Sequence, residues 1–188
     1  MNRYFLIALF LIGTTAHAER DWHIGWLGGV TNYSIDDPFG PTQSKSKFLW
    51  KDVVGLYDLS RDRRVFGMLS DNSYTVDASP TEIGQDAARK AGLLAYQFNF
   101  RLSREFKPWV GLGVGYASES YKPRYTVTST GFLKAHFPDR DVDGAFVLAN
   151  ASAQWPFAGG TAAGIHLQYE HGFSGLSDQI TAAFFISY

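Results

Sequence analysis

Leu-Ala-Tyr-Gln-Phe-Asn-Phe-Arg-Leu, from Leu94 to Leu102, gives the clearest indication of the fold. Large apolar or aromatic side chains stand at every second position, and amides and an arginine stand among the residues between them. Successive side chains of a β-strand point to opposite sides of a sheet, so this period predicts a strand with one apolar face. The other face lacks the lysines and glutamates of a water-exposed sheet, which indicates an enclosed polar side.

The same alternation recurs in later segments of the chain. The apolar members are Val110, Leu112, Val114 and Tyr116; Ile165, Leu167 and Tyr169; and Ala182, Phe184, Ile186 and Tyr188. Segments 47–59 and 64–76 alternate less clearly. Soluble antiparallel sheets also alternate. The amides, hydroxyls and glycines of the polar faces favour a polar lumen inside a wall that faces lipid.

Turn-forming residues separate eight predicted strands, at 22–33, 47–59, 64–76, 89–102, 108–121, 141–155, 161–173 and 178–188. Short and long connections alternate between them, as in transmembrane barrels, and closure removes exposed sheet edges. The sequence therefore predicts an all-β fold, an eight-stranded antiparallel up-and-down transmembrane β-barrel. Aromatic residues near strand ends predict two girdles at the membrane interfaces. One would contain Trp22, Tyr57, Phe66, Phe100, Trp109, Trp155 and Tyr188, and the other Tyr33, Phe48, Trp50, Tyr74, Tyr121 and Phe173.

Residues 1–18 have the pattern of a secretory signal peptide. Arg3 precedes a short apolar run, and Ala16 and Ala18 stand where a signal peptidase needs small residues. The apolar run is shorter than the ~20 residues of a membrane-spanning helix. We therefore expect export to the periplasm and a single barrel domain over residues 19–188.

The composition suits a wall that faces lipid. Charged residues make up 19% of the chain and aromatic residues 16%, and there is no cysteine. The formal net charge of −1 gives no indication of nucleic-acid binding.

The stretch Lys107-Pro108-Trp109-Val110-Gly111-Leu112-Gly113-Val114-Gly115-Tyr116 resembles the "P-[YW]-[VL]-G-x-G-x-G" strand of small outer-membrane barrels of the OmpA/OmpX/OmpW-like and opacity-protein group. The ending Leu167–Tyr188 is similar to their last hairpin, although that group more often ends in Phe. The resemblance implies a Gram-negative outer membrane and recognition of Tyr188 by the barrel-insertion machinery. Members include adhesins, pores for small or hydrophobic solutes, and proteins without an assigned activity.

The predicted lumen contains six polar or charged residues: Asp52, Asp58, Arg101, His166, Gln168 and Glu170. An eight-stranded barrel has an interior just wide enough for side chains to fill. These residues then form either a buried network that plugs the barrel or the lining of a narrow, selective pore. Barrel size favours the plug, because buried charges must pair with one another.

The longest predicted loop, 122–140, is rich in basic residues. Lys122, Arg124, Lys134 and Arg140 are candidates for contact with lipopolysaccharide phosphates, beside the apolar Phe132 and Leu133. The alternative is an ordinary solvated loop. The run Thr126-Val127-Thr128 favours a protruding hairpin, because β-branched residues suit strands.

An enzyme is the third alternative. His171, Ser174 and Asp178 are the nearest match to the His-x-Ser-Asn pattern of lipid A deacylases that resemble PagL. Residues three apart lie on opposite faces of a strand, so His171 and Ser174 would need a bulge or a turn to meet. Gly175 stands where the pattern has Asn. We find no metal-ligand spacing and no phosphate-binding loop, and we expect no cofactor.

The sequence as a whole favours a non-enzymatic outer-membrane barrel. Its surface-exposed loops would serve adhesion, another interaction or membrane integrity, with outer-membrane lipid and lipopolysaccharide as expected partners. An extracellular or host ligand is not specified by the sequence. The alternatives are a narrow pore for small or hydrophobic solutes and a hydrolase similar to lipid A deacylases.

Overall fold

The computed structural model describes residues 22–35, 43–100, 108–157 and 161–188. The predicted signal peptide and Arg101 lie outside the described residues. The strands are β1 (Trp22–Ile35), β2 (Gln43–Ser60), β3 (Arg63–Val76), β4 (Gln85–Asn99), β5 (Trp109–Tyr121), β6 (Arg124–Val127), β7 (Leu133–Phe137), β8 (Arg140–Pro156), β9 (Ala162–Gly172) and β10 (Asp178–Ser187). Within these ranges, no helix is long and apolar enough to cross a membrane.

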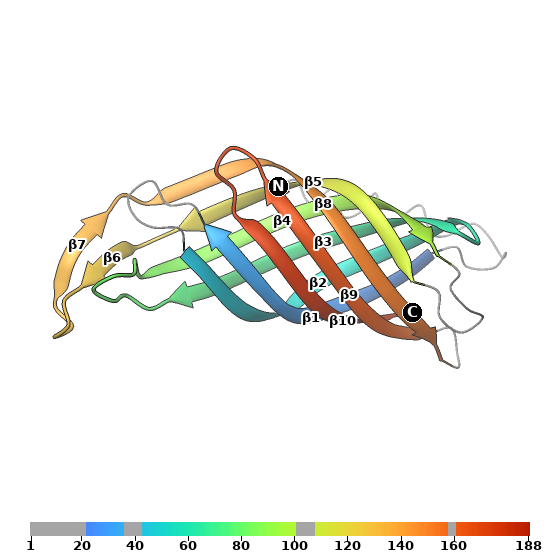
Figure 1. Ribbon diagram of the computed structural model, residues 1–188, viewed down its shortest axis with the longest axis horizontal. Coiled ribbons are helices and arrows are strands. Elements are labelled where there is room, and N and C mark those ends of the chain that lie inside the picture. Colours follow the sequence, from blue (N-terminus) through green and yellow to red (C-terminus); the bar gives the residue numbers. More distant parts are fainter. Residues whose placement is uncertain (1–21, 36–42, 101–107, 158–160) are drawn as a thin grey trace.

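Eight of these strands close into an antiparallel barrel in the order β1-β10-β9-β8-β5-β4-β3-β2 (Figure 1). β1 closes the barrel against β10, in a register that runs from Gly25 opposite Ser187 to Ser34 opposite Asp178. Closure satisfies the edge hydrogen bonds that an open sheet would leave unpaired. The predicted eight-stranded antiparallel fold is therefore confirmed.

The remaining two strands, β6 and β7, form a hairpin within the predicted loop 122–140. The β6–β7 hairpin projects beyond the barrel at the end that carries the long connections, which we call the loop end (Figure 1). The opposite end, where β8 turns into β9 and the chain finishes, is the short-turn end. One bridge between Gly84 and Tyr125 ties the hairpin to the chain that precedes β4.

Several strands are longer at the loop end than the sequence predicted. β1 continues to Ile35, β2 starts at Gln43, and β4 starts at Gln85. Most residues of these extensions are polar, like those of turns, but side chains bond across the ladder there, as Thr75 does to Asp86 at 2.7 Å. Strand ends that are exposed to water have the same polar composition as loops. For this reason the sequence predicted these strands to be shorter than they are.

The outer wall of the barrel is a continuous apolar belt. The exposed fractions of Phe184, Leu112 and Leu94 are 73%, 72% and 62%. The outward positions of β10 run from Ile180 to Tyr188, which at ~3.3 Å per residue and a tilt of ~40° gives a height of about 20 Å. Transmembrane barrels carry an apolar band of about 25 Å. Towards the loop end the belt gives way to exposed charges, such as the Lys90–Asp71 pair at 3.2 Å.

The predicted aromatic girdles are only partly correct. Trp22, Trp155 and Tyr188 are exposed near the short-turn end. Five predicted girdle residues are instead buried inside the barrel: Phe66, Trp109, Tyr33, Tyr74 and Tyr121. Position near a strand end does not determine which face a side chain occupies. Alternation does, and Trp109 shares its face with Gly111, not with Val110.

Candidate functional site

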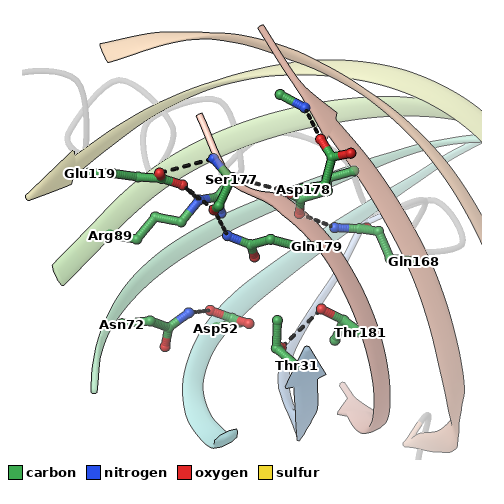
Figure 2. Close-up of polar contacts among 12 residues, drawn as sticks. Thr31, Asp52, Asn72, Arg89, Glu119, Gln168, Ser177, Asp178, Gln179 and Thr181 are labelled. Atoms are coloured by element: carbon green, nitrogen blue, oxygen red, sulfur yellow. Dashed lines mark hydrogen bonds and ion pairs between the residues drawn. The ribbon is translucent and has the colours of Figure 1, made fainter. Parts of the chain in front are cut away.

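The most highly charged part of the lumen is centred on Arg89 of β4 (Figure 2). Its Nε donates to Oε1 of Glu119 on β5 at 3.1 Å, and its NH2 donates to Oε2 of Glu170 on β9 at 2.6 Å. The three side chains are 6%, 1% and 3% exposed. An unpaired charge in the interior would be costly. The buried guanidinium and its two carboxylates therefore hold their three strands together across the interior.

The connection between β9 and β10 is anchored to this cluster. Oε2 of Glu119 accepts the Ser177 amide N–H at 3.0 Å, and Oε1 accepts the Ser177 hydroxyl at 2.5 Å. Tyr121 donates its hydroxyl to Oε2 of Glu119 at 2.6 Å. Leu176, next to Ser177, is buried in the apolar core. The connection therefore folds inward and helps to close the lumen at the loop end.

A second polar cluster lies nearer the short-turn end, around Arg64 of β3. The Arg64 guanidinium donates to Gln97 at 2.5 Å, Ser152 at 2.9 Å and Gln154 at 2.9 Å. It also stacks over the Trp109 ring, 4.1 Å from the ring centroid. Arg64 is 1% exposed, so this cluster fills the interior at its level.

Apolar layers separate and cap the polar clusters. Along β4, Leu93 and Ala95 lie between Arg89 and Gln97, and they belong to a buried apolar cluster. Its other members include Leu27, Val54, Leu56, Phe66, Met68, Phe146, Leu148 and Phe185. Beyond Glu119, towards the loop end, Tyr33 and Tyr74 stack with ring centroids 4.7 Å apart. The interior thus alternates polar and apolar layers from one end to the other.

Four predicted lumen residues lie inside the barrel: Asp52, His166, Gln168 and Glu170. Asp52 accepts a bond from Asn72 at 3.2 Å, and Gln168 links His166 at 3.1 Å to Glu170 at 2.7 Å. Asp58 also follows the inward alternation of β2, but it lies at the rim, 38% exposed and 3.9 Å from His23.

The sequence did not predict the two arginines around which the lumen is organised, Arg89 and Arg64, or Glu119. Arg89 shares the odd-numbered face of Gln97, and Glu119 shares the face of Gly111, Gly113 and Gly115. Extending the alternation of these strands by a few residues identifies both. Arg64 was hidden because its face of β3 also carries Phe66 and Met68, so no polar face stood out.

The predicted lipopolysaccharide contacts differ in accessibility. Arg124 is 1% exposed and donates to Gln85 at 3.1 Å and to the carbonyl of Pro138 at 3.1 Å, so its prediction as a surface contact is wrong. Lys122 is exposed and lies 3.8 Å from Asp141. Arg140 donates to the carbonyl of Gly175 at 2.5 Å. Lys134 is exposed, 3.4 Å from the carbonyl of Pro80.

Two of the three candidate hydrolase residues meet. His171 Nδ1 lies 3.1 Å from Oδ1 of Asp178, which also accepts the Gly172 amide N–H at 2.9 Å. β9 ends at Gly172, so Ser174 lies in a tight turn with a φ of 58°, closed by the bond from the Leu176 amide to the Phe173 carbonyl. Within the described residues, however, no hydrogen bond joins Ser174 to His171. His171 and Asp178 therefore form a pair that Ser174 does not join.

No protein-family model matches the chain, and no curated protein sequence matches it. Solved structures do. Neisserial surface protein A (NspA) aligns over 89% of this chain and 96% of its own, with 9% identity and a TM-score of 0.59. Ail, the attachment invasion locus protein of Yersinia pestis, aligns over 89% and 97%, with 11% identity and a TM-score of 0.54. The outer membrane protein OprG from Pseudomonas aeruginosa aligns over 89% and 96%, with 12% identity and a TM-score of 0.54.

At such low identity these likenesses show the fold alone. Together with the closed strand order, they establish that this chain has the eight-stranded antiparallel β-barrel fold of small bacterial outer-membrane proteins.

Proposed function

We propose that the protein is a non-enzymatic outer-membrane protein, exported through the periplasm, whose closed barrel anchors surface-exposed loops. The apolar belt supports a membrane location, because it would otherwise expose a large continuous apolar surface to water. In this orientation the short-turn end faces the periplasm and the loop end faces outward, as in other transmembrane barrels. The loops then serve adhesion, another interaction or membrane integrity.

The observation that carries the proposal is the filled interior. Arg89 bonds to both Glu119 and Glu170 across the lumen, and the three side chains are 1–6% exposed. A pore for solutes needs a hydrated path, and these three side chains occupy the path at their level. The apolar and aromatic layers block it again on either side. This arrangement favours an anchor over the alternative of a narrow pore.

The partners proposed for this anchor follow from its surfaces. The belt faces outer-membrane lipid, and Lys122, Lys134 and Arg140 remain candidates for lipopolysaccharide phosphates. Tyr188 is 63% exposed, so its ring is accessible to the insertion machinery. A role in attachment is consistent with the name of Ail, which shares the fold.

Single-channel recording in planar bilayers tests the proposal. We expect the purified barrel, its folding checked by heat-modifiable migration on a gel, to give no stable conductance. A general porin reconstituted in parallel controls for successful insertion. A stable, large conductance from the folded protein would favour the pore and contradict the proposal.

A further inference from the structure

The tip of the β6–β7 hairpin holds two large apolar side chains in the open. Phe132 is 74% exposed and Leu133 is 65% exposed, as much as the residues of the apolar belt. Both lie at the junction of the turn with β7, on the hairpin that projects farthest at the loop end (Figure 1). They therefore lie apart from the belt and contribute nothing to it.

The turn that carries them is closed by several hydrogen bonds. The Thr128 amide donates to the Phe132 carbonyl at 2.7 Å, and the Gly131 amide donates to the Thr128 carbonyl at 3.0 Å. The Thr128 hydroxyl accepts the Phe132 amide N–H at 3.1 Å. Gly131 has a φ of 84°, which glycine adopts without strain. A preformed tip loses little conformational entropy when it binds.

The exposed charge beside the tip is a cation, Lys134. Residues 122–138 contain no Asp or Glu, and of the other two cations in this range Arg124 is buried and Lys122 lies 3.8 Å from Asp141. Lys134 is exposed, directly beside Leu133. The tip is thus complementary to an apolar phase behind a negatively charged surface.

The hairpin stands far from the belt of its own barrel. The last apolar outward residue of β5 is Tyr116, and β6 ends at Val127, eleven steps of up to ~3.3 Å each. This length of chain carries the tip outward from the belt at the loop end (Figure 1). A membrane that approaches the loop end would meet the tip before it meets the belt.

We propose that Phe132, Leu133 and Lys134 form an anchor that inserts into the anionic phospholipid bilayer of an apposed membrane. The inference rests on the outward orientation given by the proposed function. An aromatic and an aliphatic side chain next to a lysine suit the water–bilayer interface. The two apolar side chains enter the bilayer there, and the lysine ammonium contacts lipid phosphates. Two side chains give weak binding per copy, so contact between membranes would depend on many copies acting together.

Vesicle capture tests this inference with the full barrel in nanodiscs. We expect capture of phosphatidylcholine vesicles that contain phosphatidylglycerol, weakened by salt, and little capture of pure phosphatidylcholine vesicles. The double variant F132S/L133S is expected to lose capture at least about tenfold, since burial of each side chain drives insertion. K134Q is expected to lose part of the capture and much of the salt dependence.

Two matched variants serve as controls. Phe157→Ser removes an aromatic that is 61% exposed at the short-turn end, and Lys90→Gln removes an exposed lysine of the barrel wall. Both are expected to bind vesicles like the unaltered protein. Unchanged capture by F132S/L133S overturns the inference, as does binding only to surfaces that carry protein or glycan. Heat-modifiable migration and conductance are measured on the same samples. If the barrel is folded and does not conduct while capture fails, the proposed function stands and only the membrane anchor is overturned.

Discussion

Arg89 illustrates how single residues hold this barrel closed. Its guanidinium compensates two buried carboxylates, Glu119 and Glu170, on different strands. Replacing it by Met leaves both acids without their cation in a site that water barely reaches. We expect R89M to lower the free energy of unfolding by about 3–5 kcal/mol, measured by urea unfolding of the barrel in lipid vesicles.

The neighbouring Lys90 provides the matched control for this prediction. Its pair with Asp71 is more than half exposed on both sides. K90M is therefore expected to change stability by less than about 1 kcal/mol. Adding E119Q and E170Q to R89M is expected to recover part of the loss. Equal stability of R89M and K90M would show that the Arg89 cluster does not hold the barrel together.

His171 and Asp178 give a prediction about chemistry at the residue scale. The pair lies on the barrel surface, but among the residues that the structure describes Ser174 has no hydrogen bond to it. We expect cells that overproduce the protein to keep the lipid A mass spectrum of cells with an empty vector. Loss of an acyl chain that depends on His171 and Ser174 would instead identify a hydrolase.

Most side chains that the sequence correctly placed inside or outside the barrel were placed by alternation along a strand. It placed His166, Gln168 and Glu170 inside because their outward neighbours are large and apolar. It could not show that Arg124 is buried, since burial there depends on contacts with Gln85 and Pro138, distant in sequence.

At the scale of elements, β5 shows how close approach between strands limits substitution. A Cβ on Gly113 would lie 2.7 Å from the Ala95 Cα of β4, which is backbone and resists displacement, whereas a Cβ on Gly55 of β2 would meet no atom within 4 Å. We expect G113A to destabilise the barrel by about 1–3 kcal/mol and G55A to be neutral or slightly stabilising. Thermal unfolding followed by heat-modifiable migration compares the two. Equal transition temperatures would contradict the packing described for β5.

Element boundaries were the weakest part of the sequence-based prediction. The barrel strands continue past the apolar belt with polar side chains, as β4 does from Gln85 to Lys90. Nothing in their composition distinguishes them from loops. The β6–β7 hairpin was suggested by its β-branched residues, but its length and its turn at Thr128–Gly131 depend on contacts that only the structure shows.

At the scale of the whole molecule, the fold was predictable because the outer face of every barrel strand contributes to the same apolar belt. The internal network was not, because the stagger of strands around a barrel decides which rows of side chains meet. Arg89 on β4 contacts Glu170 on β9, 81 residues later in the chain. No local pattern predicts that pairing.

The proposed membrane location requires that the apolar faces of these strands contact acyl chains while the other faces fill the lumen. The chain has five tryptophans, of which Trp26 is 60% exposed on the wall and Trp109 is 6% exposed in the interior. Two variants, each keeping one of these and replacing the other four by Phe, are refolded into vesicles of brominated phosphatidylcholine. We expect strong quenching of Trp26 fluorescence and weak quenching of Trp109 fluorescence. The reverse pattern, or equal quenching of both, would contradict it.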